Sequence, residues 1–398
     1  MSLPDRRERS NTAVYLLFAA VYGVAVNICA EGYIQARLLG LGFGTGGIRD
    51  YGIAVQAGSL AAYLLFTRLR CGPAGMKKIN AAAALCMGMF PAALAAAGKL
   101  KPLAALQIVI LCAAALHGFL TAARATAEYT MAPHLFARSR YGSVAGKASV
   151  IGGVIPVCIS LGAGFLLKQA EVYAFLFGVC AAAFGAAALV ACLYRLSEAP
   201  GETPPRVSLG ALARTVTAPR YLKVLLPHLL RGVGMAGIYY IVPCALENIR
   251  LSKSEEPFLI VLPVAATVAG SFLYMLLDKK MRSGAITFAS VLACSLLMPL
   301  LVVLHGKAAF LCLYFLFFIC NIVSQLSIPT GVLCSTPDAE LSLISALRML
   351  LTSAASSLFI FLFGLCLQAI APVYVLLFSS AVFALCGGLY RKQFGVRL

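Results

Sequence analysis

Ionisable and hydrogen-bonding side chains recur along the apolar segments of this chain, at spacings that place them on one face of a helix. The segment 103–134 carries His117, Thr121, Arg124 and Glu128, at spacings of 4, 3 and 4 residues. A charged side chain near the centre of a bilayer costs at least about 2.5 kcal/mol, so it normally faces a partner, a ligand or water. We therefore expect this stripe to contact a polar solute or to carry protons.

Other apolar segments carry similar polar positions. The candidate contacts to a solute are Asn27, His117, Thr121, Arg124, Arg231, Tyr239, Asn321, Gln325 and Arg348. The candidates for proton coupling or for a gate are Glu31, Glu128 and Asp278. None of these positions forms a catalytic constellation, so we expect no catalytic residues.

The stripe residues leave several interpretations open. Arg124 and Glu128 are four residues apart, so they can pair with each other, or Glu128 can pair with Arg348 as an inner gate. Direct contact of the pair with a solute or a proton is the alternative. Arg231 has no acidic neighbour in its own segment, which favours contact with a solute. His117 and His228 are more typical of packing residues than of proton carriers.

The composition excludes a water-soluble domain. Apolar residues make up 61% of the 398 positions and charged residues only 12%, and the mean hydropathy is +0.93. A bilayer core of about 30 Å needs about 20 apolar helical residues. The sequence predicts twelve such spans, at 13–35, 49–67, 76–97, 103–134, 143–167, 171–195, 221–246, 257–277, 284–304, 308–329, 341–367 and 370–390. We therefore expect an all-α integral membrane protein.

The basic residues indicate the orientation of these spans. A formal net charge of +18 would suit a polyanion partner in a soluble protein, but here most Lys and Arg lie in alternate loops. Because cytoplasmic loops are the basic ones, both termini are expected in the cytoplasm. The sequence predicts a multi-pass protein of the cell membrane with no nucleic-acid partner.

Two segments suggest an internal duplication. Tyr63 begins an apolar run that ends in Arg68 and Arg70, and Tyr274 begins one that ends in Lys279 and Arg282. The pairs Gly23-Val24 and Gly232-Val233 also lie at matching places. We predict pseudo-symmetric six-helix bundles at 1–195 and 221–398, joined by a cytoplasmic linker at 196–220 that contains a short interfacial helix.

The whole chain resembles the major facilitator superfamily. Its loop motif, Gly-x-x-x-Asp-x-x-Gly-Arg-Arg, is matched by Asp278, Lys279 and Arg282, whereas Thr67 replaces the Asp in the first half. Leu135-Phe136 with Arg140 resembles another family loop. The resemblance implies a fold of two six-helix bundles in which helices 1, 4, 7 and 10 line a central cavity.

From the stripes and this resemblance we expect a secondary active transporter, acting as a monomer by alternating access. The surplus of Arg over acidic residues favours a small polar or anionic organic solute, with proton coupling. The alternative is a multidrug/proton antiporter, and a membrane-embedded enzyme or sensor is a third class. No cofactor or metal is expected: the fourteen Cys lie mostly inside spans as buried thiols, and Gly42, Gly44 and Gly47 occupy a loop without the strand of a dinucleotide fold.

Overall fold

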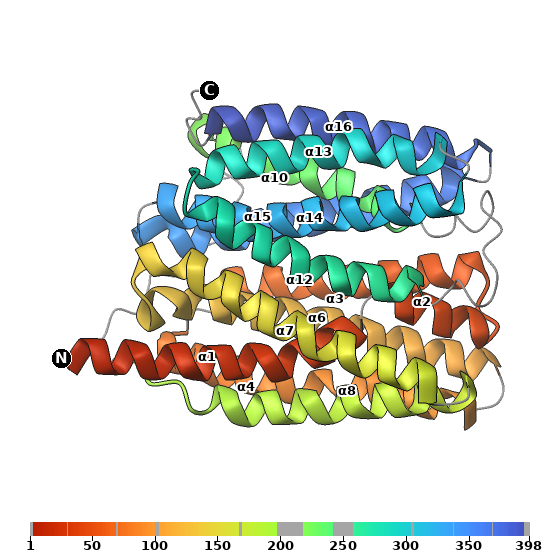
Figure 1. Cartoon of the computed structure of the whole chain (residues 1–398), viewed down its shortest axis with the longest axis horizontal. Coiled ribbons are helices and arrows are strands. Elements are labelled where there is room, and N and C mark those ends of the chain that lie inside the picture. Colours follow the sequence, from red (N-terminus) through yellow and green to blue (C-terminus); the bar gives the residue numbers. More distant parts are fainter. Residues whose placement is uncertain are drawn as a thin grey trace. The chain divides into compact units, whose positions relative to one another are not determined.

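The computed structural model is helical throughout the part of the chain that it describes, which is all residues except 1–2, 30, 69–70, 100–102, 167–168, 197–217, 242–257, 304–305, 337, 368 and 394–398 (Figure 1). The first half contains α1 (Leu3–Ile28), α2 (Glu31–Gly40), α3 (Thr45–Arg68), α4 (Pro73–Met87), α5 (Met89–Ala96), the 3-10 turn η1 (Ala97–Lys99), α6 (Leu103–Leu135), α7 (Arg138–Leu166) and α8 (Gln169–Ala191). The second half contains α10 (Pro219–Ile238), α12 (Phe258–Asp278), α13 (Ser283–Val303), α14 (Lys307–Ser335), α15 (Asp338–Cys366) and α16 (Pro372–Gln393).

Contacts divide the chain into two compact units, Met1–Leu212 and Ala213–Leu398. The first unit therefore holds α1 to α8, and the second holds α10 to α16. Most of the predicted linker, and the interfacial helix expected within it, falls on 197–217, outside the described residues.

Ten helical segments in the described part of the chain are long and apolar enough to cross a membrane. The two further spans that we predicted correspond to α3 and α10, which are 24 and 20 residues long. Both contain charged residues, including Arg49 and Asp50 in α3 and Lys223 and Arg231 in α10. These residues lower the hydropathy of the two helices, so the count of twelve spans stays a prediction.

Two predicted spans are interrupted. The span predicted at 13–35 is two helices, because α1 ends at Ile28 and α2 begins at Glu31. The span predicted at 76–97 is also divided, between Met87 and Met89. Pro91 explains the second break, because it has no N–H to donate to the carbonyl of Met87 four residues earlier. The apolar runs that we used to place the spans do not reveal such breaks.

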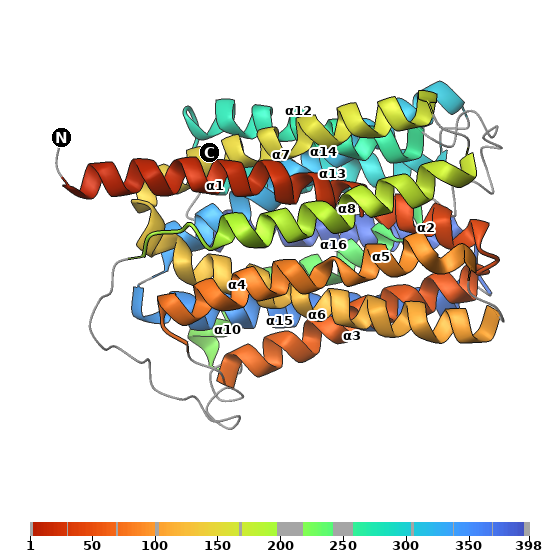
Figure 2. The same ribbon diagram turned by 90° about the horizontal axis from the view of Figure 1, so that it is seen from below.

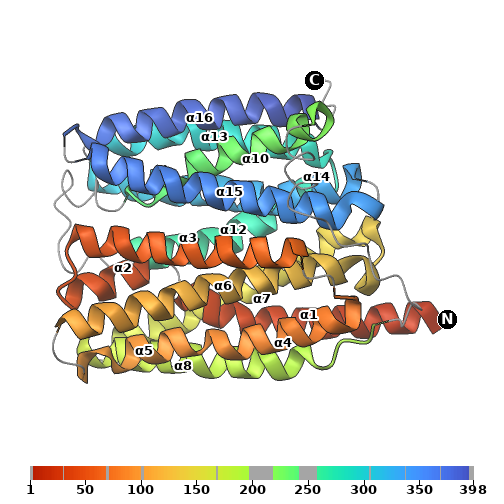
Figure 3. The same ribbon diagram turned by 180° about the vertical axis from the view of Figure 1, so that it is seen from behind.

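The same packing scheme recurs in both units. In the first, α1 packs on α7 and α8, α3 packs on α6, and α4 packs on α6 and α8. In the second, α10 packs on α15 and α16, α12 packs on α14, and α13 packs on α14 and α16. Figure 1 shows α13 beside α16, Figure 2 shows α1 beside α8, and Figure 3 shows α4 beside α8. The helices α1, α3, α4, α6, α7 and α8 thus have counterparts with equivalent neighbours in α10, α12, α13, α14, α15 and α16.

Glycines allow close crossings of helices in both units. A Cβ on Gly23 would collide with the backbone of Gly152 in α7, and a Cβ on Gly232 would collide with the carbonyl of Thr352 in α15. The two Gly-Val pairs therefore lie at equivalent crossings, of α1 with α7 and of α10 with α15. Small residues at such crossings let membrane helices approach closely and gain van der Waals contact.

The start of α1 is fastened to the residues that follow α8. The Asn11 side chain donates to the carbonyl of Arg195 at 2.9 Å and accepts from its N–H at 2.9 Å. Arg7 Nε donates to the same carbonyl at 3.0 Å, and Lys77 Nζ donates to the carbonyl of Tyr194 at 2.8 Å. Because Asn11 is almost fully buried, these bonds form a clasp within the first unit.

The cysteines are less buried than we predicted. Every described cysteine is a free thiol, but only Cys180, Cys294 and Cys386 are buried. Cys112, Cys158, Cys192, Cys312, Cys334 and Cys366 are exposed. The prediction is wrong for these six because a helix in a bilayer presents apolar residues on its outer surface as well as in its core.

Candidate functional site

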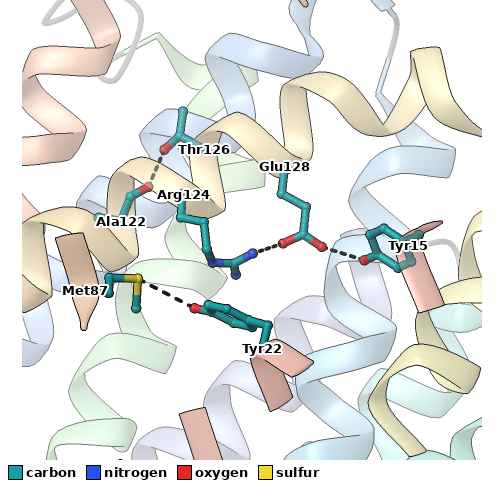
Figure 4. Close-up of polar contacts among 7 residues, drawn as sticks. All are labelled: Tyr15, Tyr22, Met87, Ala122, Arg124, Thr126 and Glu128. Carbon is teal, nitrogen blue, oxygen red and sulfur yellow. Dashed lines mark hydrogen bonds and ion pairs between the residues drawn. The ribbon is translucent and has the colours of Figure 1, made fainter. Parts of the chain in front are cut away.

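The predicted pair on α6 is an ion pair that also involves α1. Arg124 Nη1 lies 2.6 Å from Glu128 Oε2, and the Tyr15 hydroxyl donates to Glu128 Oε1 at 2.5 Å. Figure 4 shows one donor on each carboxylate oxygen. Charge-assisted bonds of this length are among the stronger hydrogen bonds in proteins. We call Tyr15, Arg124 and Glu128 the α6 triad.

Aromatic rings surround the α6 triad. The Arg124 guanidinium lies 4.1 Å from the centroid of the Tyr22 ring, which stacks on Phe18 at 5.2 Å. Tyr15 packs edge-on against Phe136 at 5.1 Å. The exposed fractions of the Arg124 and Glu128 side chains are 12% and 22%. The charges are therefore held by a cation–π contact and by each other rather than by bulk solvent.

The stripe continues along α6 toward His117. The His117 ring lies 4.9 Å from Phe90 and 6.0 Å from Phe184, as expected for a histidine inside a bundle. His117 Nδ1, Thr121 Oγ1 and Arg124 Nε are buried without a hydrogen-bond partner in the protein. The three predicted positions therefore lie together, and each retains unused hydrogen-bonding capacity.

The structure gives Asn27 a helix-packing contact. Its amide nitrogen donates to the carbonyl of Gly23 at 2.9 Å and to that of Gly152 at 3.1 Å. These bonds lie at the crossing of α1 and α7, which favours a structural interpretation over contact with a solute. Glu31 begins α2, but its side chain lies outside the described residues.

In the second unit, Arg231 reaches from α10 to α14. Its Nη2 donates to Ser324 Oγ at 3.3 Å, and its Nε is buried without a partner in the protein. Within the described part of this unit, no acidic side chain pairs with Arg231. A partly buried cation without a counter-charge is costly inside a membrane protein, so this site favours an anion.

One turn before Arg231, His228 is almost fully buried. Its Nδ1 lies 2.8 Å from the Tyr390 hydroxyl of α16, whereas its Nε2 has no partner in the protein. Arg231 and Arg348 both interact electrostatically with His228. The structure thus brings predicted residues of α10 and α15 to one histidine.

Arg348 is buried on α15, and its Nη2 lies 3.7 Å from Met349 Sδ. Thr352, one turn later, donates to the carbonyls of His228 at 3.0 Å and Arg348 at 2.8 Å. Thr352 therefore holds α10 against α15 beside His228 and Arg348.

The remaining predicted residues are more scattered. Asn321 is buried on α14, Gln325 is exposed, and Tyr239 is half-buried at the end of α10. At the end of α12, Asp278 lies 3.3 Å from the Tyr274 hydroxyl, which also lies 2.9 Å from Thr330 Oγ1. Asp278 therefore belongs to a separate contact between α12 and α14.

Sequence reasoning missed Tyr15, Tyr22 and Tyr390. Tyr15 and Glu128 are 113 residues apart, and His228 and Tyr390 are 162 residues apart. Tyr15, Phe18 and Tyr22 follow one another at spacings of 3 and 4, which is typical of one face of a helix. This aromatic stripe could have identified Tyr15 as a candidate, but not Glu128 as its partner.

Comparisons with known proteins extend this description. A family model described as Major Facilitator Superfamily matches residues 10–360. A search of curated protein sequences gives no match.

Solved structures with a similar fold cover almost the whole chain. A bacterial homologue of the iron transporter ferroportin, in an outward-facing state, has 13% identity and a TM-score of 0.72, over 98% of this chain and 99% of its own. The E. coli fucose:proton symporter FucP has 13% identity and a TM-score of 0.68, over 96% and 98%. The human organic anion transporter TETRAN has 12% identity and a TM-score of 0.63, over 99% of both chains. At these identities the likeness shows the fold alone.

Proposed function

The chain belongs to the Major Facilitator Superfamily, and from that premise we propose that it moves a small polar or anionic organic solute across the cell membrane, coupled to protons. Membership makes the chain a multi-pass membrane transporter rather than an enzyme. The identity of the solute, the coupling and the choice of membrane belong to the proposal.

The charge balance of the two units carries the choice of solute. In the first unit, Glu128 neutralises Arg124 at 2.6 Å. In the second unit, Arg231 has a serine hydroxyl as its partner and no acid among the described residues. A cationic drug would be repelled by this surplus charge, whereas an anionic or hydrogen-bonding solute would be attracted to it.

The α6 triad supports the choice of the proton as the coupling ion. Glu128 is an ionisable group in a membrane segment, and such groups commonly mark proton pathways. Arg124 and Tyr15 contact its two oxygens, and a tyrosine hydroxyl can donate to a carboxylate or accept from the protonated acid. Exchange of the proton on Glu128 therefore changes the strength of its bond to Arg124, which links protonation to the packing of α6 against α1.

Transport by purified protein in proteoliposomes tests this function. We expect a pH gradient to drive accumulation of at least one labelled organic acid from a panel. Glu128→Gln should abolish accumulation above equilibrium but retain exchange of solute across the membrane, because the amide keeps its size and cannot carry the proton. Glu8→Gln is the matched control, since Glu8 forms a looser surface pair with Arg140 at 3.4 Å.

Gradient-driven accumulation by Glu128→Gln at the wild-type level would show that Glu128 does not carry the proton. Transport of cationic drugs in place of organic acids would instead support multidrug efflux and contradict the proposed solute class.

A further inference from the structure

His228 and Arg231 each bury a polar nitrogen that has no hydrogen-bond partner in the protein. The two residues are three positions apart on α10, so their side chains leave the same face of the helix. His228 Nε2 and Arg231 Nε are both buried and have no hydrogen-bond partner in the protein. Burying a polar group without a hydrogen-bond partner is unfavourable, so these two nitrogens point to a ligand.

Both nitrogens can supply a hydrogen, that of His228 in the tautomer in which Nδ1 accepts from Tyr390. The Nε of an arginine always carries a hydrogen. For His228, the Tyr390 hydroxyl lies 2.8 Å from Nδ1, and a phenol is a good donor to an imidazole nitrogen. Donation from Tyr390 to Nδ1 leaves the hydrogen of the neutral ring on Nε2. His228 therefore presents an N–H on the same face of α10 as the N–H of Arg231.

Neighbouring hydroxyl and thiol hydrogens are already used. Ser324 donates to the carbonyl of Asn321 at 2.7 Å and accepts from Arg231. Thr352 donates to backbone carbonyls, and Cys386 Sγ donates to the carbonyl of Pro227 at 3.1 Å. The unsatisfied groups on this face of α10 are thus N–H donors, next to a guanidinium charge. A neutral polyol needs acceptors as well as donors, whereas a carboxylate only accepts.

We propose that His228 and Arg231 bind a carboxylate of the transported solute, with His228 Nε2 and Arg231 Nε each donating to one oxygen. Two donors from adjacent turns match the two oxygens of a carboxylate. This inference rests on the proposed transport function and narrows its solute to an organic acid. Tyr390 is the positioning residue, because its hydroxyl holds the imidazole in the tautomer that donates.

Binding of acetate to the purified full-length protein tests the site without knowledge of the solute. Unfolding temperature, measured at pH 7 against acetate concentration, should rise to a plateau for the wild type. Acetamide, the neutral analogue of acetate with an amide in place of the carboxylate, should produce no saturable rise. Arg231→Gln should abolish the acetate-dependent rise, and Arg231→Lys, which keeps the charge, should retain part of it.

Two variants of His228 test the roles of its two ring nitrogens separately. The amide of His228→Asn ends near the place of Nδ1, so it keeps a partner for Tyr390 and loses the Nε2 donor. The amide of His228→Gln reaches toward the place of Nε2. We expect acetate to bind His228→Asn at least tenfold more weakly than the wild type and His228→Gln within about threefold of it. A purely structural role for His228 would not separate the two in this order.

Arg391→Gln is the matched control, because Arg391 lies over the Phe288 ring at the end of α16, 5.4 Å from its centroid. Its acetate response should equal that of the wild type. Equal responses to acetate and acetamide, or wild-type acetate affinity in a folded Arg231→Gln protein, would overturn the proposal.

Transport measurements distinguish failure of this inference from failure of the proposed function. If the wild-type protein transports a neutral solute and Arg231→Gln transports the same solute at the same rate, the carboxylate site is wrong and the transport function stands. If acetate binds as expected but no organic acid crosses the membrane under any gradient, the site stands and the choice of transported solute is wrong.

Discussion

At the scale of single residues, Arg124 and Arg231 are held in different ways inside their units. Arg124 lies between a carboxylate at 2.6 Å and an aromatic ring at 4.1 Å. Arg231 has one hydroxyl at 3.3 Å. Removal of one partner from a buried ion pair leaves an uncompensated charge and costs about 3–5 kcal/mol, whereas removal of both partners costs much less. The α6 pair should therefore behave as a unit.

We predict that Arg124→Met destabilises the protein by about 3 kcal/mol, the lower end of that range because both side chains are partly exposed. Adding Glu128→Met should recover at least half of the loss, since no charge is then left unpaired. Apparent unfolding temperatures of the single and double variants measure this. The Arg140–Glu8 pair, in which Arg140 is 65% exposed, is the control, and its variants should change stability by less than about 1 kcal/mol. Additive losses at Arg124 and Glu128 would mean that the two charges are not coupled.

At the scale of helices, the glycine crossings place the interior residues of both units. Tyr22 immediately precedes Gly23, and Arg231 immediately precedes Gly232. Gly23 lies at the crossing of α1 and α7, and Gly232 lies at the crossing of α10 and α15. The residue before each glycine contacts an equivalent helix: Tyr22 lies under Arg124 of α6, and Arg231 donates to Ser324 of α14. The equivalent positions of the two units therefore carry different side chains, an aromatic ring at Tyr22 and a cation at Arg231.

The crossing of α3 and α6 gives a prediction about stability. A Cβ on Gly58 would collide with the carbonyl oxygen of Ala115, and one on Gly118 would collide with that of Val55. We expect Gly58→Ala and Gly118→Ala each to cost about 1–3 kcal/mol, because the two backbones must separate. Gly178→Ala and Gly185→Ala meet open space on α8 and should be neutral or slightly stabilising. Thermal unfolding and folded yield of the four variants check this, and equal losses at all four positions would contradict it.

The sequence is informative about contacts within one helix and much less so about contacts between helices. The spacing of Arg124 and Glu128 left a pair within the helix open, beside a gate pair with Arg348 and direct contact with a solute or proton, and the structure shows the pair within the helix at 2.6 Å. By contrast, the partners Tyr15 and Tyr390 depend on how distant helices rotate and slide against each other. Such registers are determined by close packing at small residues, and hydropathy does not reveal them. The break after Ile28 was missed for a related reason, since apolar residues continue on both sides of it.

At the scale of the whole molecule, family membership establishes the fold class of paired helical bundles that the apolar segments predicted. The orientation in the membrane stays a prediction from the basic loops. Alkaline phosphatase is active only outside the cytoplasm, so fusions to it report orientation. We expect activity for a fusion at Gly44, between α2 and α3, and none for a fusion at Lys280, between α12 and α13. The reverse result would invert the proposed topology.

The clasp between Asn11 and the backbone of Arg195 has a consequence for the order in which the protein is made. It joins the start of the first helix of the first unit to the residues just after its last helix. Its bonds can therefore form as soon as residue 195 leaves the ribosome, before any helix of the second unit has left it. The first unit can then complete its own packing during synthesis, so its incompletely packed helices need protection from aggregation only until that point.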